Sequence, residues 1–239
     1  MSAEAMLGWL WAGVRLVAVT ASATLASGLI GWTAMLVWHD RMAAWVIGRA
    51  AGITSYLLLV VLTGLGLLLS HPAGVRWHRP SRATRLRLHV SLAMFTLAFT
   101  TLHVVVLASD PYAGVGWRAT FVPMASTYRP VPVTLGVIGL YAGLLAGLTA
   151  ALAGRVGLRL WWPIHKVAVV SLVLVWVHGL QAGADSAALR WMYVGTGAGV
   201  LVLAASRYIA RTPADWLGEL GSGAAAHHPT DGTGLRAPR

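Results

Sequence analysis

The sequence predicts an all-α integral membrane protein, a bundle of six transmembrane helices with both termini in the cytoplasm. Of its 239 residues, 57% are apolar and only 10% are charged, and the mean hydropathy is +0.70. A soluble domain carries about 25% charged residues, so this chain has too few to cover a water-facing surface. The apolar residues gather in segments of about 20, the length that crosses a bilayer as a helix. The basic residues gather between these segments.

Six segments are long and apolar enough to cross the membrane. They cover residues 16–38, 47–70, 88–108, 132–153, 162–181 and 188–207, which together form one transmembrane domain over 16–207. The apolar lead-in, residues 1–15, either extends the first helix or lies in the membrane interface. The tail, 208–239, is rich in glycine, alanine and proline. It is expected to be mostly disordered beyond a short helix around 215–220.

Basic loops orient the predicted bundle. The loops 71–87 and 154–166 and the start of the tail carry more arginine and lysine than the opposite side, which places them in the cytoplasm. The net charge is +11, and the charges lie between apolar spans. They are therefore interpreted as topology signals and lipid-headgroup contacts, and no nucleic-acid partner is expected. The expected location is the plasma membrane or bacterial inner membrane.

Four histidines form two matched pairs within the apolar spans. His89 and His103 are 14 positions apart in the third span, and His165 and His178 are 13 positions apart in the fifth. Each pair covers roughly 20 Å along a helix, about two thirds of a hydrocarbon core roughly 30 Å thick. The predicted topology makes these two helices parallel. Side by side, they could hold two stacked haems, each iron bound by one histidine from each helix.

The alternative is that these histidines are structural and bond to neighbouring spans. One geometric difficulty also stands. Residues 14 positions apart share a helix face, but residues 13 positions apart do not, so His165 and His178 require a bulge, a kink or differently rotated haems. Pro163 lies close to His165, so a departure from ideal helix is expected there.

With these features the chain resembles the ferric reductase-like transmembrane domain family, the haem-binding membrane part of NADPH oxidases and ferric reductases. The resemblance covers about 45–207 and rests on the histidine pattern. Supporting segments are GRAAG at 48–52, the loop 109–130 and GADSAALRWM at 183–192. It implies two b-type haems, an inner one on His89/His165 and an outer one on His103/His178. The flavin and nicotinamide domains of full-length oxidases have no counterpart here, so flavin is expected only in a partner.

Several other side chains are candidates for contacts with these haems. Arg82, Arg85 or Arg87 could pair with propionates of the inner haem, and Arg129 with those of the outer one, because guanidinium binds carboxylates bidentately. The alternative for the arginines is topology and lipid contact. Trp176 could contact a porphyrin, and Trp117 could shield the outer haem. Other tryptophans, Trp161 and Trp162 among them, are interpreted as an interfacial aromatic belt.

Hydroxyl groups near the histidines have two interpretations. Thr100, Thr101 and Ser171 could support the second ring nitrogen of a ligand, but ordinary helix packing is the preferred interpretation. Other histidines lie at span ends, in loops or in the tail and give only weak ligand signals; these are His39, His71, His78, His227 and His228. GTGAG at 195–199 is interpreted as close helix packing. No catalytic residue is predicted.

The expected function is transmembrane electron transfer, as the membrane component of an oxidoreductase. Electrons would pass from a cytoplasmic donor, such as a flavin reductase, to an extracytoplasmic acceptor protein or small oxidant. One alternative is a quinol-linked cytochrome b anchor, which would need a quinone pocket near one face; the sequence shows no clear one. The other alternative is a non-redox transporter or structural membrane protein, which would be colourless when purified.

Overall fold

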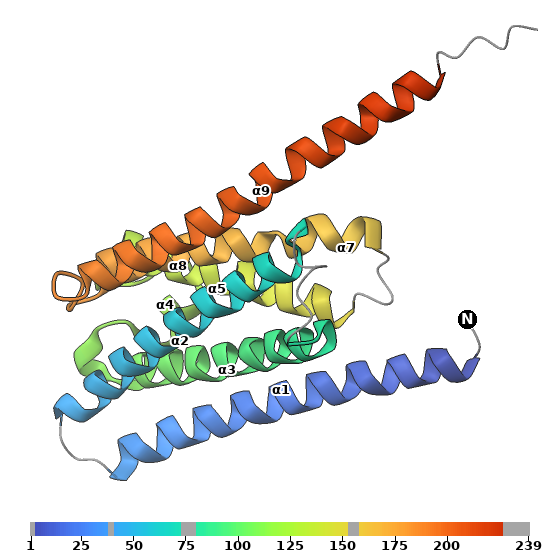
Figure 1. Cartoon of the computed structure of the whole chain (residues 1–239). Helices are drawn as coiled ribbons and strands as arrows, with labels where there is room; N and C mark the ends of the chain where they lie inside the picture. Colours follow the sequence, from blue (N-terminus) through green and yellow to red (C-terminus); the bar gives the residue numbers. More distant parts are fainter. Residues whose placement is uncertain (1–2, 38–40, 73–79, 153–157, 227–239) are drawn as a thin grey trace, which may run out of the picture.

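The computed structural model describes residues 3–37, 41–72, 80–152 and 158–226, and all regular elements in this part of the chain are helices (Figure 1). They are α1 (Ala3–Val37), α2 (Arg41–Leu69), α3 (Arg82–Ser109), the short 3-10 helix η2 (Pro111–Ala113), α4 (Gly116–Phe121), α5 (Pro130–Ala151), α7 (Leu158–His165), α8 (Val167–Ala182) and α9 (Arg190–Ala226).

Among the residues that the structure describes, five stretches of helix are long and apolar enough to cross a membrane. They are Met42–Leu69, Arg82–Ser109, Pro130–Ala151, Trp161–Ala182 and Arg190–Ala210. Many large apolar side chains on these helices are exposed, which suits a lipid environment. These features indicate a multi-pass membrane protein. The expected first span, 16–38, lies largely in α1. It remains a prediction, as does the cytoplasmic position of both termini.

The first and last helices extend beyond the expected spans. Because α1 begins at Ala3, the lead-in is a continuation of the first helix. Residues 215–220 are helical, as expected, but they belong to a longer helix, because α9 runs without interruption from Arg190 to Ala226. Extending a formed helix needs no new nucleus, which explains the single long element. Residues 221–226, where disorder was expected, are also helical, and the rest of the tail, 227–239, lies outside the described residues.

The bundle has two halves and a helix that joins them. In one half α2 packs along α3, with α1 on another side of α3; in the other half α5 packs along α8. Helix α9 contacts both α2 and α8, and it lies across the bundle from α1 (Figure 1). Helix α3 carries His89 and His103, and α8 carries His178; these two helices are not a closely packed pair within the described chain. The two halves therefore meet along a seam bordered by α3 and α8.

Aromatic side chains pack α9 against α2 and α8. Tyr56 of α2, Leu172 of α8 and Tyr193 of α9 form a buried core cluster. The rings of Tyr56 and Tyr193 lie 5.0 Å apart between centroids, and the Tyr56 hydroxyl is hydrogen-bonded to the hydroxyl of Thr196. Such interhelical hydrogen bonds hold helices together in lipid, where apolar contact alone gives little driving force.

The fifth span is broken between its two histidines. Helix α7 contains Pro163 and ends at His165, and α8 begins at Val167. At the junction the amide of Val169 donates to the carbonyl of Lys166. This bond joins residues three positions apart, as in a 3-10 turn, and not four apart as in an α-helix. The departure from ideal helix expected from the 13-residue spacing is thereby confirmed.

Candidate metal centre

The four histidines meet in the predicted pairs across the seam. The ring centroids of His89 and His165 are 6.3 Å apart, with an angle of 66° between the ring planes. Those of His103 and His178 are 6.5 Å apart, with an angle of 80°. Both pairs bring one ring from α3 together with one from the α7–α8 span. All four residues keep part of their surface accessible.

These separations match the geometry of two imidazoles bound to opposite sides of one metal ion. A metal–imidazole nitrogen bond is about 2.0–2.1 Å long. Ring bonds of about 1.33 Å place each nitrogen about 1.1 Å from the ring centroid. Two axial imidazoles therefore have centroids about 6.4 Å apart. The observed 6.3 and 6.5 Å agree with this value at both sites.

Hydrogen bonds fix the tautomer of the His103–His178 pair. His103 Nδ1 lies 2.7 Å from the carbonyl oxygen of Gly48, and His178 Nδ1 lies 2.7 Å from that of Pro132. A carbonyl oxygen only accepts, so Nδ1 must carry the proton and donate it. In a neutral ring Nε2 then keeps its lone pair, which is the state required of a metal ligand.

The His89–His165 pair is held more loosely. His165 Nδ1 donates to the carbonyl of Ala146 over 3.4 Å, a long hydrogen bond. His89 Nδ1 is buried and faces the backbone of Leu62 without reaching hydrogen-bonding geometry. The same kind of acceptor, a backbone carbonyl on the adjacent helix, therefore lies beside each of the four rings.

Glycines let three of the rings approach the neighbouring helix. A Cβ atom on Gly52 would lie 2.7 Å from Nδ1 of His103, and one on Gly136 would lie 2.8 Å from Nδ1 of His178. A Cβ atom on Gly66 would lie 3.2 Å from Cε1 of His89. Each glycine is four residues after the backbone group that its histidine faces. We call each such carbonyl and glycine, one helical turn apart, a ring socket.

The backbone groups that face the rings repeat with the same spacing as His89 and His103. On α2 the facing backbone groups belong to Gly48 and Leu62, and on α5 to Pro132 and Ala146, so both helices show a separation of 14 residues. The His89–His103 separation on α3 is also 14, but the His165–His178 separation is 13. The break at Lys166 lies where this difference of one residue must be absorbed.

The donor set fits a haem. Among the described residues, no three histidine, aspartate or glutamate side chains gather closely enough to hold a bare metal ion. A pair of neutral imidazoles suffices when a porphyrin supplies the equatorial nitrogens, because only the two axial positions remain. The residues present therefore fit two bis-histidine haems, stacked along the seam.

Of the three arginines near His89, only Arg85 is buried. Arg85 is 8% exposed and lies four residues before His89, which places both on one face of α3. Arg82 and Arg87 are exposed. Arg87 lies two residues before His89, about 160° around the helix from it. The structure thus brings Arg85 toward the His89–His165 pair and leaves Arg87 on another face.

Arg129 lies at the His103–His178 end of the bundle. It precedes Pro130 at the start of α5, and its Nη1 donates to the carbonyl of Gln181, three residues after His178. A role for Arg129 toward an outer haem stays a prediction.

Trp176 is not brought together with the histidines. Its indole Nε1 donates to the carbonyl of Tyr193 at 3.0 Å, and an added Cβ on Gly197 would lie 3.5 Å from that nitrogen. The indole therefore packs on α9. Trp176 is two residues before His178, so the two side chains leave α8 about 160° apart. Its contact with a porphyrin remains untested.

The hydroxyl groups of Thr100 and Ser171 behave as helix-packing groups, as the preferred interpretation expects, and that of Thr101 stays a prediction. Thr100 Oγ1 donates to the carbonyl of Thr96 in its own helix, and Ser171 Oγ donates to the carbonyl of Gly139 on α5, both at 2.7 Å. The support for the rings comes from backbone carbonyls instead. Sequence reasoning missed these groups because they carry no distinctive side chain. The available signal was the 14-residue spacing of Gly52 and Gly66, equal to that of His89 and His103.

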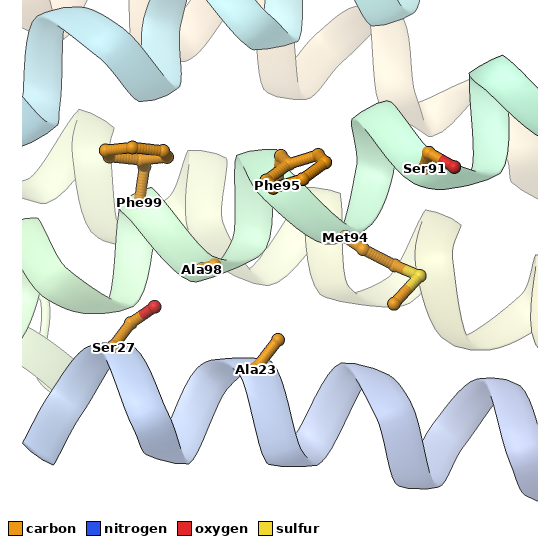
Figure 2. Close-up of a pocket in the computed structure, with 7 residues that line it drawn as sticks. All are labelled: Ala23, Ser27, Ser91, Met94, Phe95, Ala98 and Phe99. Carbon is orange, nitrogen blue, oxygen red and sulfur yellow. The ribbon is translucent and has the colours of Figure 1, made fainter.

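A groove of about 340 Å³ lies between α1 and α3 (Figure 2). Its lining includes Ala23, Ser27, Ser91, Met94, Phe95 and Phe99. The α3 residues lie midway between His89 and His103 along the helix, on the side that faces α1. The groove shares no residue with the ring sockets and does not lie near one membrane face. It therefore gives no support to a quinone site.

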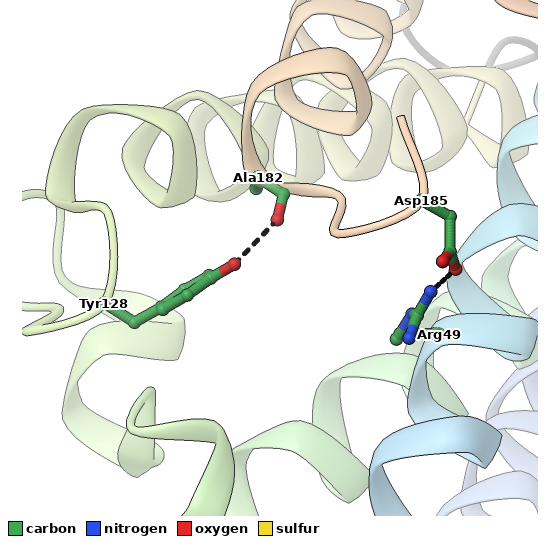
Figure 3. A network of polar contacts seen from close by, with 4 residues as sticks. All are labelled: Arg49, Tyr128, Ala182 and Asp185. Atoms are coloured by element: carbon green, nitrogen blue, oxygen red, sulfur yellow. Dashed lines mark hydrogen bonds and ion pairs between the residues drawn. The ribbon is translucent and has the colours of Figure 1, made fainter. Parts of the chain in front are cut away.

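Polar contacts fasten the loops at the His103–His178 end (Figure 3). Arg49 of α2 forms an ion pair with Asp185, in the segment after α8, and also lies 4.0 Å above the centroid of the Trp45 ring. The Tyr128 hydroxyl donates to the carbonyl of Ala182 at 3.0 Å. The first contact links α2 to the segment that leads into α9, and the second links the loop before α5 to the end of α8.

Comparison of the chain with known proteins gives no match to a protein-family profile, a curated protein or a solved structure.

Proposed function

We propose that the chain is a di-haem b-type protein that carries electrons across a membrane. The observation that supports this most directly is the pair of histidine couples, with centroid separations of 6.3 and 6.5 Å where a shared axial ion requires about 6.4 Å. The proposal is also in line with the resemblance of the sequence to the ferric reductase-like family. Two such centres stacked along the bundle would offer stepping points across most of the hydrocarbon core.

The chain's own residues bind, orient and insulate the cofactors. Each pair would supply two ring nitrogens to its iron, and backbone carbonyls on α2 and α5 accept the Nδ1 protons of His103, His165 and His178, which leaves Nε2 of these rings free to ligate. The iron of each haem would supply one-electron redox chemistry. With both axial positions occupied by histidine, direct binding of oxygen at iron is not expected. The final acceptor would therefore be reduced at a porphyrin edge or in a partner protein.

The direction of transfer follows from the predicted topology. The basic loops place the His89–His165 pair near the cytoplasm and the His103–His178 pair near the outer face. Electrons would enter at the inner pair from a separate cytoplasmic donor, which we propose to be a flavin reductase, and leave from the outer pair. Arg85 is the best-placed cation for an inner propionate, because it is buried on the face of His89.

The experiment that tests the proposal is a reduced-minus-oxidised absorbance spectrum of the detergent-purified protein, with haem quantified per chain. Two b-type haems are expected. His89→Leu or His165→Leu should remove one, and His103→Leu or His178→Leu the other. His71→Leu is the control, because His71 lies outside both pairs. A colourless protein, despite adequate haem supply during expression, would overturn the proposal and favour a transporter or a structural protein.

A donor assay tests the second half of the proposal. The purified haem protein is mixed with a flavin reductase and NAD(P)H, and haem reduction is followed by absorbance. When an outer acceptor is present, reduction of that acceptor should depend on both haem sites. Failure with every flavin reductase tried, alongside reduction by a quinol analogue, would replace the flavoprotein donor with a quinol and support a cytochrome b anchor.

A further inference from the structure

Trp161 is coupled to the inner histidine pair. It lies in α7, four residues before His165, and its ring stacks on the imidazole of His165 with centroids 5.2 Å apart and an angle of 22° between planes. The neighbouring Trp162 is 37% exposed, with its centroid 5.7 Å from that of Trp161. Trp162 suits the interfacial belt expected from the sequence, whereas Trp161 is turned to the ligand.

The indole N–H of Trp161 is buried and has no hydrogen-bond acceptor within the described structure. An indole nitrogen is a donor only, so no rotation of the ring can satisfy it in another way. Leaving such a group unsatisfied costs free energy, and buried donors in folded proteins nearly always have a partner. The observation therefore points to an acceptor supplied from outside the described chain.

The position of Arg85 indicates the charge of that acceptor. Arg85 precedes His89 by four residues, as Trp161 precedes His165 by four, so each lies about 6 Å along its helix from its histidine and on the same face. Since the two histidines face each other, an indole N–H and a buried guanidinium border the same end of the seam. The acidic residues whose side chains the structure describes, Asp110 and Asp185, lie at the opposite end. This donor set suits an anion.

We propose that Trp161 Nε1 and Arg85 together bind a carboxylate of the porphyrin held by His89 and His165. This inference rests on the proposed function and deepens it, because it adds Trp161 as a cofactor-binding residue and orients the inner porphyrin. Its carboxylate edge faces the end of the bundle where α7 begins. A charge-assisted bond from an indole N–H and a guanidinium also gives this site a preference for free carboxylates over esters.

The test compares two porphyrins on the haem-free full-length protein in detergent. Haemin carries two free propionate carboxylates, and in haemin dimethyl ester both are methylated and uncharged. Both are titrated into His103→Leu protein, in which the outer pair is broken, and binding is followed by the Soret absorbance. We expect haemin to bind at least about tenfold more tightly than its diester, the range of a hydrogen bond to a charged group.

Substitutions assign that preference to the two side chains. Trp161→Phe keeps an aromatic ring against His165 but removes the N–H, and it should reduce the preference for haemin severalfold. Arg85→Gln should do the same by removing the charge, which keeps the inference testable should Trp161→Phe fail to fold. Trp162→Phe is the matched control, and it should leave the preference unchanged.

Three outcomes would overturn the inference. The first is equal binding of haemin and its diester by the protein with Trp161 intact. The second is an unchanged preference in both Trp161→Phe and Arg85→Gln. The third is an equal weakening of both porphyrins by Trp161→Phe, which would indicate another acceptor such as a lipid phosphate. Failure of both porphyrins to bind would instead refute the proposed function, so the two failures are distinguishable.

Discussion

Gly52 lies directly against the imidazole of His103, so close that a Cβ atom on it would stand 2.7 Å from Nδ1 and 2.8 Å from Cε1. The same ring donates its Nδ1 proton to the carbonyl of Gly48, one turn earlier on α2. The backbone of α2 thus lies against this imidazole, and it positions the ring through the absence of a side chain. Gly136 and Pro132 repeat the relationship with His178 on α5.

Replacing Gly52 with alanine is expected to remove the outer haem while leaving the inner one. The added Cβ and Nδ1 would have to move apart, and neither the α2 backbone nor the rigid ring of His103 can move freely. Ring displacement would break the bond to Gly48 and misplace Nε2. The measurement is haem per chain, together with a redox titration that resolves the two centres.

Gly64→Ala is the matched control for this substitution. Gly64 lies in the same helix, but an added Cβ there would meet its nearest neighbour, Cδ2 of Leu203, at 3.8 Å, an ordinary contact. The control should retain both haems. Equal haem content in Gly52→Ala and Gly64→Ala would contradict the ring-socket interpretation.

Arg129→Leu tests the predicted outer propionate contact. If Arg129 binds a propionate, its loss should lower the midpoint potential of the outer haem, because a nearby cation favours the more negatively charged reduced state. The inner potential should stay constant. Arg118→Leu is a control for the loss of a positive charge at the same end of the bundle. An unchanged outer-haem potential and occupancy in Arg129→Leu would reject the contact with a propionate. The role of Arg129 would then be its hydrogen bond to the carbonyl of Gln181.

Tyr56→Phe should destabilise the bundle without altering either haem. The hydroxyl of Tyr56 bonds to Thr196 across the α2–α9 contact, and its ring is buried. Interhelical hydrogen bonds in membrane proteins contribute about 0.6 kcal/mol on average and up to about 1.7 kcal/mol. Thermal unfolding in detergent measures the loss. Tyr112→Phe, at an exposed ring, should cost nothing measurable, and equal stability of the two variants would refute the prediction.

The sequence carried enough information to predict the histidine pairs, because histidines are rare in membrane spans and their depth follows from counting residues. It also predicted the irregular segment near His165, since 13 positions cannot keep two side chains on one face of an ideal helix. Here the structure agrees, with α7 ending at His165 and α8 beginning at Val167.

The ring sockets and the role of Trp161 could not be predicted in the same way. A carbonyl acceptor exists at every residue, so only the packing of α2 on α3 and of α5 on α8 selects Gly48 and Pro132. Ser171 drew attention because it carries a hydroxyl, yet its bond goes to Gly139. Trp161 was assigned to the interface from its position alone, since stacking on His165 depends on the turn of α7.

The helix pair α5–α8 allows a last comparison between a ligand-orienting contact and a packing contact. Gly136→Ala should remove the outer haem, because its Cβ would lie 2.8 Å from Nδ1 of His178. Ser171→Ala should retain both haems and lower only stability, because Ser171 Oγ bonds to the Gly139 carbonyl at 2.7 Å and to no histidine in the described structure.

Gly147→Ala is the control on α5, because nothing in the described structure lies within 4 Å of a Cβ added there. Haem per chain and thermal unfolding, measured on all three variants, separate the two effects. Gly136→Ala should differ from Gly147→Ala in outer-haem content, and Ser171→Ala should differ from it only in unfolding temperature. Loss of the outer haem in Ser171→Ala but not in Gly136→Ala would show that the hydroxyl, and not the backbone of α5, orients His178.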